Sequence, residues 1–137
     1  MKKFLTVLMV VSMLMSLSGT INAAVIPPEN PVMPCWEYIN SIDLDLRFYG
    51  TDGSASLTIT RVAGVTTSLE ATLTVYEKVG TEWVVVTSDS TSSSRSIFLE
   101  ISFDAESGVT YKAEVSVTAY GPGGSETETT SDTETCP

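Results

Sequence analysis

Residues 109–120 read VTYKAEVSVTAY, with apolar or aromatic side chains at the odd positions and mostly polar ones between them. A period of two is typical of a β-strand that has one buried face and one solvated face. The next four residues, Gly121-Pro122-Gly123-Gly124, favour a turn that returns the chain as a neighbouring strand. We expect this longest alternation of the chain to form the central strand of a sandwich.

Shorter alternations, separated by turn residues, predict six further strands at 42–49, 55–62, 69–75, 82–88, 97–103 and 125–135. Residues 35–40 are a candidate for an additional strand. Residues 88–94 are all serine, threonine or aspartate, and we expect a loop there. The last stretch alternates acidic residues with threonine and is expected at a sheet edge, where its charges oppose aggregation. The fold class is therefore all-β, a seven- to eight-stranded antiparallel immunoglobulin-like sandwich.

The N-terminal residues have the features of a signal peptide. Lys2 and Lys3 precede an apolar run over residues 4–17, and Ala23 and Ala24 offer small residues for cleavage after either one. The run is too short for a stable membrane span. No second apolar run of that kind follows Ala24, so we expect no membrane insertion once the signal is removed. The predicted organisation is a signal peptide at 1–24, a proline-rich leader at 25–34 and one sandwich domain at 35–137, secreted to the extracellular side.

The chain has only two cysteines, Cys35 and Cys136, one at each end of the predicted domain. In an exported protein such a pair predicts a disulfide, which would be worth roughly 4–5 kcal/mol for so long a loop. The bridge also has a geometric condition, because the two Cα atoms must approach to within about 7 Å. The segment 35–40 would have to run back along the sheet before the strand at Ile42 begins.

Charge restricts the possible partners. Without Lys2 and Lys3, five basic residues remain against 17 acidic ones, a net charge near −12. This charge repels phosphate backbones and anionic lipid heads, so nucleic acid and acidic membranes are poor candidates. We expect a monomer that needs no cofactor.

The segment from Ser107 to Glu126, with its tyrosine, its valine-rich alternation and its glycine-rich turn, resembles the last two strands of fibronectin type III domains. In that family a tyrosine at the position of Tyr111 bonds the backbone at a corner. The whole exported chain also resembles a family of small secreted proteins of clostridial-type Gram-positive bacteria, in Pro34-Cys35-Trp36-Glu37-Tyr38-Ile39, in the hairpin 69–83 and in 111–126. This likeness implies export and an immunoglobulin-like sandwich but no activity, and the acidic balance of this chain departs from it.

Catalytic chemistry has little support in the residues. The chain has no histidine, which excludes a Ser-His-Asp triad and zinc-histidine motifs. Carboxylates two residues apart, Asp43 with Asp45 and Glu126 with Glu128, lie at roughly the spacing of glycosidase acids, so a small secreted hydrolase is a remote alternative. Asp43, Asp45 and Asp52 are weak calcium candidates, for which a solvated acidic face is the favoured interpretation.

The aromatic residues give the stronger functional lead. Tyr76 and Tyr120 fall on the solvated side of their alternations, and Trp83 lies in a stretch with two partly apolar faces. Exposed rings anchor protein interfaces or stack on sugars, although cross-strand pairing within the sheet is the more ordinary use. We expect a non-catalytic binding module for an unknown extracellular protein, not an enzyme, with a carbohydrate-binding module as the alternative.

Overall fold

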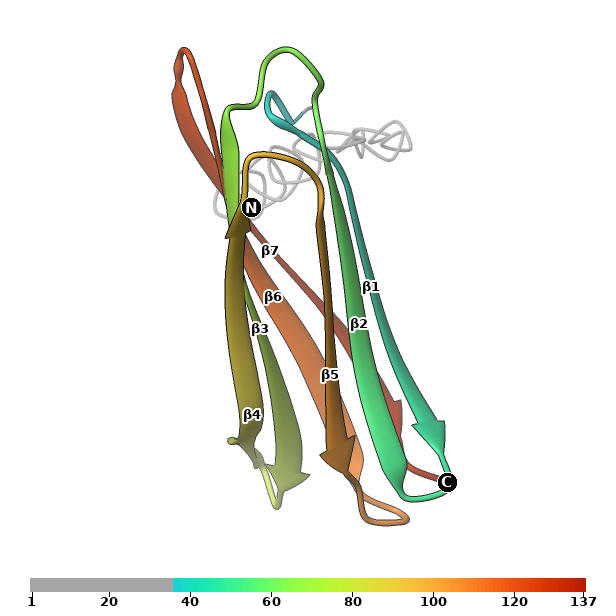
Figure 1. The fold of residues 1–137 in the computed structure, drawn as a ribbon. Coiled ribbons are helices and arrows are strands. Elements are labelled where there is room, and N and C mark those ends of the chain that lie inside the picture. Colours follow the sequence, from blue (N-terminus) through green and yellow to red (C-terminus); the bar gives the residue numbers. More distant parts are fainter. Residues whose placement is uncertain (1–35) are drawn as a thin grey trace, which may run out of the picture. The chain divides into compact units, whose positions relative to one another are not determined.

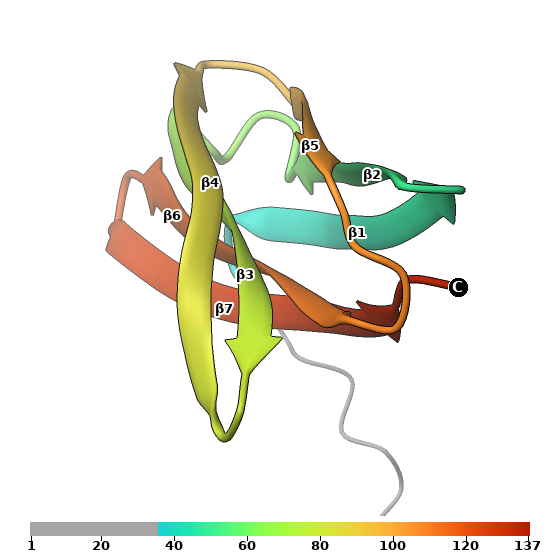
Figure 2. The ribbon, with the colours of Figure 1, turned by 90° about the horizontal axis from the view of Figure 1, so that it is seen from below.

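The computed structural model describes residues 36–137, and the predicted signal peptide and leader lie outside them. Seven strands follow one another: β1 (Ile39–Tyr49), β2 (Asp52–Arg61), β3 (Ser68–Val79), β4 (Glu82–Ser93), β5 (Ile97–Asp104), β6 (Thr110–Gly121) and β7 (Gly124–Thr135). They form two antiparallel sheets, with strand orders β1-β2-β5 and β4-β3-β6-β7. The two layers face each other (Figures 1 and 2), and the predicted all-β sandwich is confirmed.

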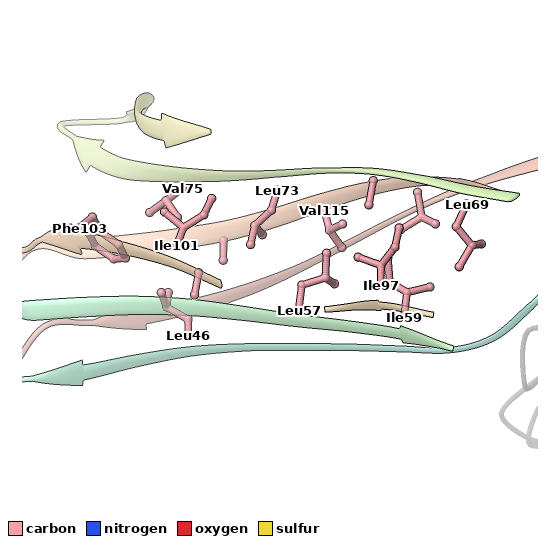
Figure 3. Packing of buried hydrophobic residues seen from close by; sticks show 14 of the residues in the cluster. Leu46, Leu57, Ile59, Leu69, Leu73, Val75, Ile97, Ile101, Phe103 and Val115 are labelled. Carbon is pink, nitrogen blue, oxygen red and sulfur yellow. The ribbon is translucent and has the colours of Figure 1, made fainter. Parts of the chain in front are cut away.

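The core lies between the sheets because the period-two pattern of each strand turns one set of side chains inward. Strand β6 lies between β3 and β7 and is central to its sheet, as residues 109–120 predict. Its inner side chains meet those of β2, β3 and β5 (Figure 3). The large aliphatic residues that are at most 2% exposed are Ile39, Leu46, Leu57, Ile59, Leu69, Leu73, Val75, Val115 and Val117.

Each end of the sandwich is closed by an aromatic ring that lies on a glycine. At one end the ring of Tyr38 covers Gly121, and at the other the ring of Phe103 covers Gly53, so that a Cβ atom at either glycine would overlap the ring. Phe103 also packs against Phe48 and Tyr111, with ring centroids 6.1 and 5.3 Å away. These glycines are needed for close approach, since their side of the strand is already filled.

The tyrosine corner predicted from the sequence is present. The hydroxyl of Tyr111 accepts a hydrogen bond of 2.9 Å from the backbone N–H of Glu106, and the ring is 1% exposed. The bond fixes the connection that leads from β5 into β6.

Two expectations about strands need correction. The prediction of a loop at 88–94 is wrong, because β4 continues to Ser93 and pairs with β3 as far as Leu69↔Ser93. Hydroxyl pairs between Thr72 and Ser90 at 2.8 Å and between Thr74 and Ser88 at 3.0 Å accompany this pairing. The second correction concerns the candidate strand at 35–40. Residues 39 and 40 belong to β1, with a register shift between Ile39 and Ser41, and do not form a strand of their own.

Candidate functional site

The longest run of consecutive exposed apolar residues among residues 36–137 is on β4. The side chains of Trp83, Val84, Val85 and Val86 are 37%, 44%, 56% and 37% exposed. β4 is an edge strand, paired with β3 on one side only. The β3–β4 hairpin projects away from β1, β2 and β5 (Figure 2), so no sheet covers its inner face, to which Val84 belongs. Trp83 and Val85 lie on its outer face, opposite Lys78 and Tyr76.

Cross-strand register assembles an aromatic and cationic cluster beside this strand. Tyr76 of β3 is paired with Lys112 of β6 and with Val85 of β4, and Lys78 is paired with Trp83. The Nζ atom of Lys112 lies 4.6 Å from the ring centroid of Tyr76 and 5.2 Å from that of Trp83, at cation–π distance from both. The hairpin patch is defined as Tyr76, Lys78, Val79, Trp83, Val84, Val85, Val86 and Lys112.

The lysines of the hairpin patch are distinctive in this acidic chain. Lys78 lies 5.9 Å from the ring of Trp83, and Lys112 also pairs with Glu114 at 3.2 Å. They are the only lysines after residue 3. The patch therefore combines apolar area with two amines, one of which is paired with Glu114.

The third aromatic candidate, Tyr120, is not part of this patch. It lies eight residues along β6 from Lys112, roughly 26 Å away on the same face of the sheet. Its hydroxyl donates a hydrogen bond of 3.1 Å to Glu70, and this bond and the charge of Glu70 raise the pKa of Tyr120 above 10.0. The structure thus brings Tyr76 and Trp83 together and leaves Tyr120 apart.

Acidic side chains of β7, the opposite edge strand of the same sheet, bind the backbone of β1 in the other sheet. Glu126 of β7 accepts hydrogen bonds from the backbone N–H groups of Glu37, Tyr38 and Ile39 at 2.9, 2.7 and 2.8 Å. Asp132, six residues further on, accepts one from Leu46 at 3.0 Å. β7 is an edge strand as predicted, but these acidic side chains face β1, where they occupy backbone donors.

The predicted metal and acid residues are not gathered into a site. Asp43 accepts a hydrogen bond from Ser41, and Asp45 forms an ion pair with Arg47. Asp52 is the first residue of β2 and lies opposite Tyr49. Within residues 36–137 no three Asp, Glu or Cys side chains lie close enough to hold a metal ion. Of the predicted carboxylate pair Glu126 and Glu128, Glu126 accepts three hydrogen bonds from backbone donors, which is a structural use.

Cys136 is buried, 1% exposed, next to the β1–β2 turn, where its thiol lies 3.3 Å from the carbonyl oxygen of Gly50. Cys35 lies outside the described residues, so its pairing with Cys136 stays a prediction. The geometric condition for that pairing is not met by the residues that follow Cys35. Tyr38 contacts the β6–β7 hairpin, and β1 then runs roughly 35 Å in one direction to reach Gly50.

Comparison with known proteins gives no family. No family model matches the chain, and no curated protein matches it significantly. Among the described residues, none forms a helix of the length and apolar character needed to cross a membrane.

Proposed function

We propose that this chain is an exported, non-catalytic binding module that holds a protein partner at the hairpin patch, on an immunoglobulin-like scaffold of the fibronectin type III kind. The observation that carries the proposal is the run of four consecutive exposed apolar residues, Trp83 to Val86, on an edge strand. Such an edge offers unpaired backbone groups as well as apolar area, which suits a partner segment that binds in extended conformation.

The edge strand β1 of the other sheet supports this choice of surface by contrast. The backbone donors at the start of β1 and at Leu46 are occupied by carboxylates of β7. On β4, in contrast, the segment from Trp83 to Val86 has neither a charged residue nor a proline. Edge strands that have no partner are normally protected by such residues, so an unprotected one indicates an interaction surface.

Sugar stacking is a poor use of the same rings. Lys112 lies over both Tyr76 and Trp83, and Lys78 lies over Trp83 as well. A pyranose that stacked on the same ring face would have to displace these amines. An interface with a protein is compatible with them, because a carboxylate of the partner can pair with each lysine while the valines are buried.

The test is affinity capture from bacterial and host surface extracts with the exported chain and with Val85→Lys, which places a charge in the middle of the apolar run. Phe98→Ser is the matched control, because Phe98 is 70% exposed but lies on β5 in the other sheet. We expect a specific captured protein that Val85→Lys loses and Phe98→Ser retains. A capture pattern that Val85→Lys leaves unchanged would refute the hairpin patch as the binding surface.

A further inference from the structure

We infer that the outer face of the four-stranded sheet is a second binding surface, for an uncharged polysaccharide. It is separate from the hairpin patch and does not depend on the proposed protein partner. The face is uncovered, since β1, β2 and β5 pack against the other side of this sheet (Figure 2).

The pairing registers place hydroxyl residues in three consecutive rows across four strands. The rows run from β4 through β3 and β6 to β7, and all but two of their twelve positions are serine or threonine. Glu70 and Glu114 are the two exceptions. In order, the rows are Ser92-Glu70-Thr118-Thr127, Ser90-Thr72-Ser116-Thr129 and Ser88-Thr74-Glu114-Ser131.

Hydrogen bonds between strands fix the positions of several of these hydroxyls. Thr72 bonds Ser90 at 2.8 Å, and Thr118 bonds Thr127 at 2.9 Å. Each such pair uses one donor, so it still presents one donor and three acceptor lone pairs to solvent. Ordered hydroxyls of this kind match the hydroxyls of a sugar, which are also both donors and acceptors, and the threonine methyl groups can contact the C–H faces of the ring.

The face is hollowed at its centre. A depression of about 430 Å³ is lined by Glu70, Thr72, Ser90, Ser92, Ser116 and Thr118. Tyr120 lies beside it, with its hydroxyl bonded to Glu70. Among residues 36–137, lysines lie over the rings of Tyr76 and Trp83 but not over the ring of Tyr120. Tyr120 is therefore the aromatic platform and Glu70 the strong acceptor of the surface.

Charge decides the class of glycan. The face carries Glu70 and Glu114, and the exported chain has a net charge near −12. An acidic polysaccharide would be repelled by both. The three rows cover residues 70–74 of β3, and Tyr120, which is paired with Ser68, extends the surface to a length of roughly 20 Å, long enough for several sugar units of an extended neutral chain.

The experiment is depletion of the exported chain from solution by insoluble cellulose, chitin, xylan and β-1,3-glucan, with polygalacturonate as the acidic comparison. We expect binding to at least one neutral polysaccharide, at least tenfold weaker for Glu70→Ala and for Tyr120→Ala. Thr72→Val, which keeps the shape of the side chain, should weaken binding without loss of the near-UV circular dichroism of the folded domain.

Tyr49→Ala and Glu100→Ala are matched controls, because these two residues line a hollow of about 530 Å³ on the outer face of the other sheet. They and Val85→Lys should leave polysaccharide binding unchanged. The inference is overturned if no neutral polysaccharide depletes the chain, if polygalacturonate binds better, or if the control variants weaken binding as much as Glu70→Ala does. Loss of protein capture in Val85→Lys with glycan binding retained would separate this surface from the proposed protein site.

Discussion

Replacement of Glu126 by alanine tests the contact that joins the two sheets at one end of the sandwich. The carboxylate accepts three backbone N–H groups, two on Oε1 from Tyr38 and Ile39 and one on Oε2 from Glu37. Alanine removes all three acceptors. The donors of Tyr38 and Ile39 are partly buried, while that of Glu37 is exposed and can bond water.

The expected loss follows from the two donors that water cannot easily reach. A hydrogen bond to a charged group contributes about 1.5–3 kcal/mol, and an unsatisfied buried donor costs about 1–3 kcal/mol. We therefore expect Glu126→Ala to lower the free energy of unfolding by about 3 kcal/mol, which for a domain of this size lowers Tm by roughly 12–24 °C. Glu126→Gln should lose about half as much, because its amide oxygen can still accept from Tyr38 and Ile39.

The measurement is urea unfolding followed by tryptophan fluorescence. Glu128→Ala is the matched control, because Glu128 has the same side-chain length on the same face of β7 and accepts no backbone donor from residues 36–137. The reasoning is refuted if Glu126→Ala costs less than about 0.5 kcal/mol, or no more than Glu128→Ala, since surface substitutions usually fall within that range.

Four further results are expected. Gly121→Ala should cost about 1–3 kcal/mol in thermal unfolding because its Cβ overlaps the Tyr38 ring, and in a Tyr38→Ala background most of that penalty should vanish. Tyr111→Phe should cost about 1–2 kcal/mol in urea through the lost bond from Glu106, and an unchanged midpoint would contradict the corner. Burial, and after it the charge of Glu37, raise the pKa of Tyr38 above its usual 10.0. The folded state therefore holds the phenolic proton more tightly, so this contribution to the free energy of unfolding should be fully present below pH 10 and be lost above it, and the loss should be less steep in Tyr38→Phe. Cys136 should be alkylated only after unfolding, and an intact mass lower by one pair of hydrogens would instead establish the predicted bridge.

Local periodicity in the sequence was sufficient to predict most of the strands and their buried faces. The alternations of residues 55–59, 69–75 and 109–120 identified the buried side chains of β2, β3 and β6, because a strand turns successive residues to opposite faces whatever its neighbours are. Tyr111 was also identifiable, since its position before a valine-rich alternation is a local signature. The solvated sides of Tyr76 and Tyr120 followed from the same period.

Other features depended on partners distant in the sequence. Residues 88–93 have the composition of a loop and are a strand only because β3 offers a paired edge and hydroxyl partners. The acidic alternation of β7 indicated solvent exposure, and only the approach of β1 turned Glu126 and Asp132 into acceptors of backbone bonds. The composition of β7 could not predict these contacts, because the backbone donors lie about 90 residues earlier in the sequence than the carboxylates that accept from them.

By itself, the sequence determined the all-β class, the alternating inner and outer faces and the corner tyrosine, because these depend on dihedral preference and on side-chain period within one strand. Only the tertiary structure decided which strands are neighbours. This arrangement places the amine of Lys112 of β6 over the rings of Tyr76 of β3 and Trp83 of β4, and it leaves Tyr120 beside Glu70 at the far end of the same face. The physical reason is that a period of two fixes the face of a side chain, whereas the pairing register of three strands fixes what stands beside it.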